Sequence, residues 1–491
     1  MTPEFKAWLR SGARRCLLAE VGVRVAGVDT VRYLSTTGYV SGASDTPAST
    51  AYLARLTGGF SFEQDLDVSG AGGGGASFGE LLLDNVDGAL DGWLVDVWSR
   101  RSVKLYLGDP TWARSQFVLV FDGTVEDIEP RGRGTLALIL RDAMAVLDVP
   151  ITTDTVGGAG ANADSAYPVA LGECFNVEPQ LVSETGLATY RVSLGTVEQI
   201  VEVRDNGYPV TVIKNEAAGT FTLQYQRWGQ ITCDVQGAKP GTGYLNDVGG
   251  LVYALATEIG TGPRLLPAQF DTAALVAFRA ACPQPVGLFT DGRTTVLDAI
   301  RGLSASVGAT AMTTRLGQVR LVRLGFGTPT LSVGPDDMVD GSFEPVGRPQ
   351  ISGKVRLSGL VNWTPQAKNS LVADLQPNQI TSLSERSTIK DAYDNTVLAD
   401  YNQVDALDEE VETLLVVESD LQQEATRRLN LWKVPRTVFR FTTYFDRLDI
   451  ELGDTLTVTH PRLGLAGGSP ALVTRVETDF ISGRIGIEVL V

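Results

Sequence analysis

The chain contains a single histidine, His460, which stands in the setting Thr459-His460-Pro461 at the end of a predicted strand. Hydrolases of the Ser-His-Asp and Cys-His classes need an imidazole that a second side chain holds in place. A lone histidine normally lacks that orienting partner. The sequence therefore weighs against both classes, and we assign no catalytic residue.

The four cysteines are far apart in the sequence and form no C-x-x-C pair, and no histidine stands beside any of them. They are Cys16, Cys174, Cys233 and Cys282. This spacing predicts neither a zinc nor an iron–sulfur site, although distant cysteines can still meet in a fold. We expect small buried apolar side chains at these positions, with no bound metal and no cofactor.

Carboxylates are the remaining chemical groups that could act in catalysis, since a glycosidase needs only two of them. With 58 acidic residues in the chain, some pair lies at a suitable distance in almost any fold, so their number decides nothing. Tryptophans could form platforms for sugars, but their dispersed positions fit apolar cores equally well. They are Trp8, Trp93, Trp98, Trp112, Trp228, Trp363 and Trp432.

Two short motifs resemble ligand sites but lack the required context. The run Gly70–Gly75 is not followed by Lys-Ser/Thr or by a predicted helix, so we expect a loop rather than a phosphate cradle. Asp84, Asp87 and Asp91 lack the spacing and the flanking helices of an EF-hand. We interpret residues 85–88 as a turn after a buried strand.

Composition limits the protein class. A chain of 491 residues should divide into three or four domains, and 43% hydrophobic content is typical of a globular protein. The formal charge of −17 argues against a broad surface for nucleic acid or for an anionic membrane. It suits either a soluble surface or a channel wall that must not bind DNA. We expect no signal peptide and no membrane anchor, because no apolar run has the required length.

Periodicity predicts the elements that position these residues, starting with two β-rich regions. Residues 1–150 contain a helix at Pro3–Arg10, with Trp8 and Leu9 on its buried side, and then mostly strands. The region ends in two hairpin arms, at 117–125 and 134–142. Residues 151–245 form a small all-β module after a loop at 156–166, with Asp205-Asn206-Gly207 as a hairpin turn.

The second half is more helical. Residues 246–330 should form a helix-plus-hairpin domain with helices at 249–258, 271–281 and 294–303, and with a hairpin around Gly317. Residues 331–420 contain a strand at 354–363, and we interpret the polar run 384–416, with Asp408-Glu409-Glu410, as a solvated face or loop.

Residues 421–491 give the clearest pattern. Leu421, Ala425, Leu429 and Trp432 recur at helical spacing, and alternating strands follow around the turn Leu452-Gly453-Asp454. We expect this helix to lie against the small antiparallel sheet that those strands form.

The order of parts from EATRRLNLWKVPR through IELGDTLTVTHPRLGL to LVTRVETDFISGRIGIEVLV resembles the end of a bacteriophage tail hub or baseplate protein. Two further passages are similar to siphophage tail proteins. One runs from the turn at 84–88 through the strands at 103–109 and 121–128. The other is residues 167–179, which follow the pattern P-x-x-x-G-x-x-x-N-V-x-P.

The resemblance implies a β-rich α+β, multidomain protein with tail-tube-like β-barrel hub domains at 1–150 and 421–491. It also implies a structural, non-enzymatic role as a homotrimeric hub at the distal end of a siphovirus tail, with two barrels per chain matching the six positions of the tube. The partners would be the distal tail or tail tube protein, the tape measure protein, and a tail fibre or central tip protein. DNA would only pass through the lumen during ejection.

The implied location is the virion, after synthesis in the host cytoplasm. Two alternatives stay open: a tail-associated cell-wall hydrolase with paired carboxylates, and a carbohydrate-binding host-recognition protein. The linear division into domains also stays open, because strands far apart in the sequence could close one barrel together.

Overall fold

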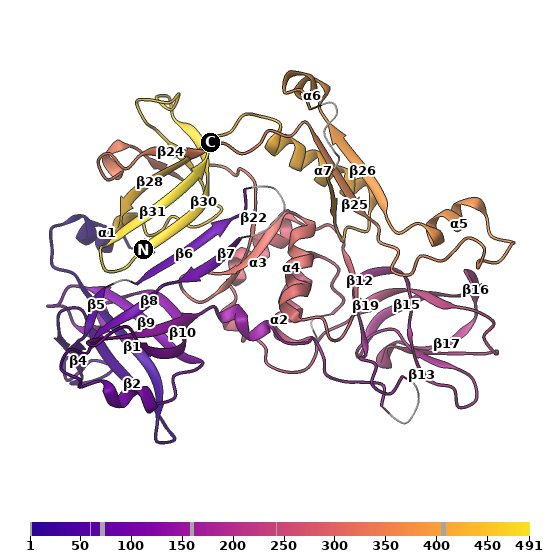
Figure 1. The fold of residues 1–491 in the computed structure, drawn as a ribbon, viewed down its shortest axis with the longest axis horizontal. Helices are drawn as coiled ribbons and strands as arrows, with labels where there is room; N and C mark the ends of the chain where they lie inside the picture. Colours follow the sequence, from indigo (N-terminus) through magenta and orange to yellow (C-terminus); the bar gives the residue numbers. More distant parts are fainter. Residues whose placement is uncertain (1, 59, 69–73, 158–161, 242, 404–408) are drawn as a thin grey trace.

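The computed structural model describes residues 2–58, 60–68, 74–157, 162–241, 243–403 and 409–491. About 41% of the chain is strand and 20% is helix, which confirms the predicted β-rich α+β multidomain class. Figure 1 shows the two large sheets at one end of an elongated molecule, the all-β module at the other end, and the helices α2, α3 and α4 between them. Within the described residues, no helix is both long enough and apolar enough to cross a bilayer.

The N-terminal sheet has nine strands in the order β3-β4-β2-β1-β9-β10-β11-β8-β5. The predicted hairpin arms are confirmed as β10 and β11, which pair antiparallel with a bulge near Val125. Helix α1 (Pro3–Arg10) precedes the sheet and buries Phe5 and Leu9, whereas Trp8 is only partly buried. The strands are β1 (Cys16–Val25), β2 (Val28–Ser35), β3 (Tyr39–Val40), β4 (Ala51–Ala54), β5 (Leu56–Gly58), β8 (Glu80–Asp84), β9 (Arg101–Gly108), β10 (Val118–Pro130) and β11 (Thr135–Arg141).

The C-terminal sheet has the order β23-β29-β30-β31-β28-β24, and it also includes the hairpin β6–β7 from the first hundred residues. The predicted turn at Gly453 is present, with φ +85° at the glycine. The strands are β6 (Ser61–Leu66), β7 (Gly74–Phe78), β23 (Leu331–Val333), β24 (Glu344–Gly347), β28 (Val438–Tyr444), β29 (Thr455–Val458), β30 (Ser469–Asp479) and β31 (Arg484–Leu490).

The all-β module consists of a five-stranded sheet, β16-β15-β19-β12-β20, and a four-stranded sheet, β13-β14-β18-β17, around one core. The predicted turn joins β15 to β16, with positive φ at Asn206 and Gly207 as a tight hairpin requires. The strands are β12 (Pro168–Val177), β13 (Gln180–Ser183), β14 (Thr189–Arg191), β15 (Val197–Asp205), β16 (Tyr208–Val210), β17 (Val212–Asn215), β18 (Thr220–Leu223), β19 (Ile231–Ala238) and β20 (Gly287–Asp291).

The central helices agree with the sequence prediction to within a few residues. They are α2 (Val248–Thr257), α3 (Thr272–Ala281) and α4 (Val296–Ser306), followed by the hairpin β21 (Ala309–Thr313) and β22 (Val319–Arg323). Asp271 caps α3 as expected, and its side chain accepts a hydrogen bond from the backbone N–H of Ala274. All of these elements share one core with the last long helix.

The region at 354–412 is more ordered than the polar composition indicates. Strands β25 (Lys354–Gly359), β26 (Thr388–Tyr393) and β27 (Glu410–Glu412) form a three-stranded sheet, with α5 (Pro377–Ser384) and α6 (Asn395–Asp400) beside it. Of the two alternatives for 384–416, the loop was therefore wrong for β26, α6 and β27, whereas a solvated face agrees with their mostly exposed or half-buried side chains. Their polar side chains pair across strands, as Arg356 does with Asp391 at 2.8 Å. Residues 404–408, including Asp408, lie outside the described part.

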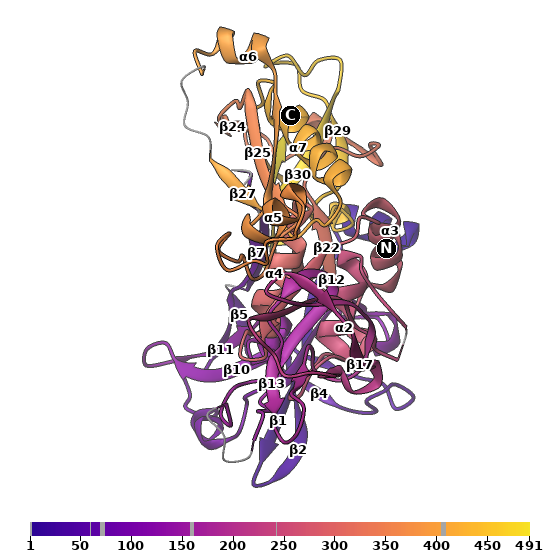
Figure 2. The same cartoon turned by 90° about the vertical axis from the view of Figure 1, so that its right-hand side faces the viewer.

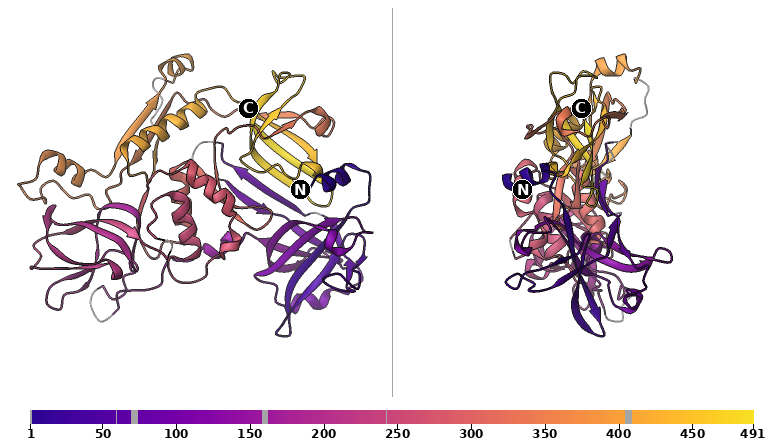
Figure 3. Two further views of the ribbon diagram at one scale, coloured as in Figure 1. Left: turned by 180° about the vertical axis from the view of Figure 1, so that it is seen from behind. Right: turned by 90° about the vertical axis from the view of Figure 1, so that its left-hand side faces the viewer.

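Helix α7 (Glu418–Trp432) confirms the predicted helix but differs in what it packs against. Leu421, Ala425 and Leu429 pack on the three-stranded sheet and the central helices, and only the end of the helix, at Leu431 and Trp432, reaches the C-terminal sheet. Figure 3 shows α7 lying along the three-stranded sheet. The periodicity indicated one apolar stripe on this helix. It could not indicate that the first part of the stripe packs on one sheet and its end on another.

Candidate functional site: the junction between the two large sheets

The residues that the sequence singled out for chemistry occupy structural positions. His460 stacks on the ring of Phe343, with ring centroids 4.3 Å apart, and its Nδ1 accepts a hydrogen bond from the backbone N–H of Arg462 at 3.3 Å. These contacts fix the ring at the end of β29.

All four cysteines are buried and free of disulfide bonds, as expected for small apolar positions. Burial raises the pKa of Cys174 to about 12 and also raises the pKa values of Cys16, Cys233 and Cys282. The thiols are therefore protonated at neutral pH and poor nucleophiles. Among the described residues, no group of three or more His, Cys, Asp or Glu side chains could hold a metal ion.

The acidic tract after β8 is a turn, as predicted. Asp84 accepts a hydrogen bond from the backbone N–H of Val86, Asp87 pairs with Arg55 at 2.6 Å, and Asp91 accepts one from the Asn85 amide. Each carboxylate thus has a partner within its own turn or at Arg55, between β4 and β5. In the glycine run, Gly74 and Gly75 begin β7, and the predicted loop at 70–73 lies outside the described residues.

The described part of the chain instead brings together segments very far apart in sequence at the junction of the two large sheets. Strand β6 pairs antiparallel with β30, so that Ser61 lies opposite Asp479 and Asp65 opposite Arg475. Strand β6, which follows β5 of the N-terminal sheet in the sequence, thus becomes part of the C-terminal sheet. The backbone hydrogen bonds of β6 join two regions more than 400 residues apart along the chain.

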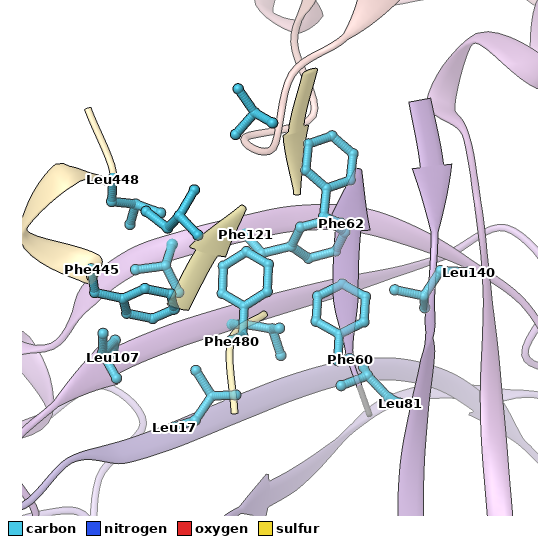
Figure 4. Packing of buried hydrophobic residues seen from close by; sticks show 14 of the residues in the cluster. Leu17, Phe60, Phe62, Leu81, Leu107, Phe121, Leu140, Phe445, Leu448 and Phe480 are labelled. Carbon is cyan, nitrogen blue, oxygen red and sulfur yellow. The ribbon is translucent and has the colours of Figure 1, made fainter. Parts of the chain in front are cut away.

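Aromatic side chains fill this junction. Phe121 of β10 lies with its ring centroid 4.8 Å from that of Phe60, 5.8 Å from that of Phe62 and 5.8 Å from that of Phe480. Figure 4 shows these rings converging from both sheets, with Phe445 beside Phe480. Each ring is at most 2% exposed, and fully burying such a side chain stabilises the fold by about 1.5–3 kcal/mol. One apolar core consequently spans both sheets.

The turn of the hairpin β21–β22 packs against strand β10 at this junction. Its turn residue Arg315 donates from Nη1 to the carbonyl oxygen of Val120 at 3.1 Å, and the backbone N–H of Asp122 donates to the Arg315 carbonyl at 2.9 Å. Gly317 has φ +71°, and a Cβ there would lie 2.9 Å from the Asp122 carbonyl oxygen. Only glycine fits this turn without strain, because the position combines a left-handed backbone with a close neighbouring strand.

Helix α1 provides a third connection. Lys6 pairs with Asp449 at 2.6 Å and Arg10 with Asp446 at 2.8 Å, both on the segment between β28 and β29. Figures 1 and 3 place α1 beside the C-terminal sheet, although the strands that follow it belong to the N-terminal sheet. The N-terminal helix therefore crosses from one sheet to the other.

Charges at the junction are partly buried. Burial raises the pKa of Asp122 despite the nearby ammonium group of Lys104 at 3.5 Å. Burial lowers the pKa of Arg315, and the carboxylates of Glu451 and Asp449 act in the opposite direction. These pKa shifts arise because the charged groups are packed at a joint between two sheets.

A buried ion cluster holds α7 to the central helices. Burial alone would raise the pKa of Glu424, but the guanidinium groups of Arg427, Arg428 and Arg323 lower it to about 2. Arg428 also donates to the carbonyl oxygen of Ala305 at the end of α4. The carboxylate and its three partners fix the helix that leads into the C-terminal sheet.

The sequence did not indicate this junction. Phe60, Phe62, Phe121 and Phe480 each fit an ordinary strand pattern, and nothing in their spacing pairs β6 with β30. The only sequence signal was Gly317 between two strands, which indicated a tight turn but not the contact that it makes.

No protein-family model matches the chain, and no curated protein matches it. Among solved structures, it is similar to a chain of the virion of a native gene transfer agent particle, with 15% identity, a TM-score of 0.44 and coverage of 69% of this chain and 87% of that one. It is also similar to the 43 kDa tail protein of prophage MuSo2 from Shewanella oneidensis, with 10% identity, a TM-score of 0.40 and coverage of 97% and 98%.

A tail protein from Neisseria meningitidis MC58 gives 11% identity and a TM-score of 0.38, with coverage of 96% of each chain. All three scores are below 0.5. The names of these proteins therefore assign no role to this one.

Proposed function

We propose that this protein is a structural component of a bacteriophage tail, a homotrimeric hub at the distal end of a siphovirus tail. Each chain would contribute two barrel-like domains, so three chains would present six to a hexameric tube. The resemblance of the C-terminal passage and of residues 167–179 to tail hub proteins suggests this role.

The observation that best supports the proposal is the single core shared by the two large sheets. A subunit that occupies two of six positions in a ring must hold its two barrels at a fixed angle, because any hinge between them would break the ring. Three contacts would oppose such a hinge: the pairing of β6 with β30, the close approach of the Gly317 turn to Asp122, and the ion pair of Lys6 on α1 with Asp449.

In this proposal the protein has no enzymatic activity. The partners are the distal tail or tail tube protein above, the tape measure protein inside, and a tail fibre or central tip protein below. The net charge of −17 suits a lumen through which DNA passes without binding. Contact of the fibres with the host would shift the packing between domains and open the axial passage.

The N-terminal sheet offers an edge for contacts between subunits. Val40 on the edge strand β3 is 67% exposed, and Leu53 on the adjacent strand β4 is 48% exposed. Apolar side chains at an open edge favour pairing with another chain. We place the subunit contact of the trimer there.

For domain boundaries, we propose the ranges 1–150, 151–245, 246–330, 331–420 and 421–491, with two exceptions. Strands β6 and β7 belong to the C-terminal sheet, and most of α7 packs with the region before it.

Sedimentation velocity of the purified chain tests the proposal. The expected species has three times the chain mass of 52.4 kDa. Val40→Lys should shift it to a monomer, because a charge at the edge opposes close packing. Val95→Lys is the matched control, since Val95 is 86% exposed but lies outside the strand edges. A wild-type monomer at every concentration that also fails to bind tail tubes would refute the hub role.

A further inference from the structure

A groove of about 830 Å³ lies between the all-β module and the segment that carries α5. Figures 1 and 2 place α5 next to the module, with the three-stranded sheet beyond it. The volume is within the range of about 300–1,000 Å³ that is typical of small-ligand sites. Neither the hub proposal nor the junction described above uses this groove.

One wall of the groove is a face of α5 and of the residue that follows it. Asn378, Thr381, Ser382 and Glu385 recur at spacings of three and four residues, which places them on one side of the helix. The hydroxyl groups of Thr381 and Ser382 donate to backbone carbonyls within α5 at 3.0 and 3.1 Å. Their oxygen lone pairs remain available to accept hydrogen bonds from a ligand.

The opposite side contributes aromatic surface. Trp363 and Phe175 both line the groove, and the backbone N–H of Trp363 donates to the carbonyl oxygen of Phe175 at 3.3 Å. The ring of Trp363 lies edge-on to the ring of Phe289, with the two centroids 6.3 Å apart. The indole is half-buried and therefore held in place with part of its surface open.

A buried polar network fixes this aromatic floor. The Asn176 amide donates to the side-chain oxygen of Asn362 at 2.9 Å and to the carbonyl oxygen of Thr364 at 2.8 Å. Asn176 has φ +52° and is fully buried. Its neighbour Gly172 is equally constrained, since a Cβ there would lie 1.9 Å from the Val286 carbonyl oxygen. These contacts fix the backbone next to Phe175 and Trp363, which line the groove.

The charge of the groove limits what it can bind. Glu173, Asp234 and Glu385 line it, and the described lining residues include no lysine or arginine. Asp234 is already paired with Arg204 at 2.8 Å, and one oxygen of Glu173 accepts from the Asn246 amide at 3.1 Å. The site therefore disfavours phosphates and other anions, and it offers acceptors for ligand hydroxyl groups.

We propose that this groove binds a neutral oligosaccharide. An indole face stacks against the C–H face of a sugar ring, and the hydroxyls, amides and carboxylates around it bond to the sugar's own hydroxyls. The alternative ligand, a cationic peptide, would use the carboxylates but leave the hydroxyl face of α5 without a partner. This inference is independent of the hub proposal, since it concerns the isolated chain.

Isothermal titration calorimetry of the full chain tests the inference with three neutral probes: cellotetraose, maltotetraose and the tetramer of N-acetylglucosamine. We expect saturable binding of at least one of them. Trp363→Ala should weaken it by roughly tenfold, because the substitution removes the aromatic surface on which a sugar ring would stack. Thr381→Ala should weaken it by roughly fivefold through one lost hydrogen bond.

Two matched controls separate the groove from other sites. Trp228→Ala removes a tryptophan that is 58% exposed on the module but outside the groove, and Thr396→Ala removes an exposed helical threonine on α6. Both should bind like the wild type, and thermal melting checks that every variant is folded. Loss of binding in Trp228→Ala with retention in Thr381→Ala would overturn the assignment. So would binding of tetralysine in place of all three sugars.

Discussion

The two ends of this molecule are joined to the rest in different ways. The two large sheets share one core, which includes residues from Phe5 to Val489, and strand β6 from the N-terminal part of the chain pairs in the C-terminal sheet. The all-β module keeps an apolar core between its two sheets, and through Val169, Leu171 and Ala238 it also packs into the core of the central helices. It meets the α5 segment through the buried network at Asn176 and Asn362 and through a small apolar cluster that includes Leu371 and Leu383. A close-packed core transmits a local change to the side chains that share it. We infer that the two large sheets respond together to a change in their common core, whereas a change between the module's own two sheets stays within the module.

The largest expected effect comes from opening the shared core. Phe121→Ala should cost about 3–5 kcal/mol of unfolding free energy, because it leaves a cavity between rings from both sheets. Hydrogen exchange should then increase in β1, β9, β30 and β31 together. Phe221→Ala, at a position 1% exposed in the module core, should cost a similar amount but increase exchange only within the module. If Phe121→Ala increased exchange in only one of the two large sheets, the two sheets would not share a core.

Removing the charge of Glu424 should have a comparable or slightly smaller effect. Glu424→Gln leaves three guanidinium groups without their carboxylate, at a cost of about 3 kcal/mol.

The contribution of Glu424 to the free energy of unfolding should depend on pH. The folded pKa of about 2 lies below the unfolded value of about 4.3, so the stabilisation is complete above about pH 5 and is lost as pH falls toward 2. Urea denaturation between pH 2 and 7 measures it. The exposed pair of Glu80 with Arg131 is the control, and Glu80→Gln should cost at most about 1 kcal/mol. Identical pH slopes for the wild type and Glu424→Gln would refute the role of the cluster.

Alanine substitutions at Gly317 and Gly186 test the contact between the β21–β22 turn and the N-terminal sheet. Gly317→Ala should cost about 2–3 kcal/mol, since φ is +71° and the new Cβ would press on the Asp122 carbonyl. Gly186→Ala has the same kind of backbone, with φ +84°, but open space around it, so it should cost about 1 kcal/mol. Chemical denaturation measures the loss of unfolding free energy in each variant. The difference between the two losses is the contribution of the contact with the N-terminal sheet.

The smallest effect concerns Asp122. Its pKa is raised by burial, so the ionised carboxylate destabilises the fold at neutral pH, and the fold gains stability as pH falls through the raised pKa. Asp122→Asn should raise the melting temperature slightly at pH 7, and this gain should shrink toward pH 4. A gain that does not depend on pH would assign the effect to packing instead of charge.

The sequence predicted local elements far better than their partners. The helix at 3–10, the cap at Asp271 and the turn at 205–207 follow from side-chain periodicity and turn chemistry that act over a few residues. The pairing of β6 with β30 could not be predicted, because strand alternation specifies a face and not a neighbour. The apolar stripe of α7 could be recognised as buried, but its division between two sheets depends on contacts far away in the chain.

The candidate sites follow the same rule. The predictions for His460 and for the Asp84–Asp91 tract used only local context, and the structure shows a ring contact at His460 and a turn at the tract. The groove beside Trp363 combines residues from 173 to 416, and Trp363 was one of seven dispersed tryptophans in the sequence. Only the folded chain brings it next to the hydroxyl face of α5.

Electron micrographs of the purified protein, alone and mixed with tail tubes, would show whether it forms the proposed hub. We expect class averages with threefold symmetry in which each subunit contributes two density lobes to a ring, and rings that cap one end of the tube. Single particles without symmetry that leave the tube ends bare would rule out the trimeric hub.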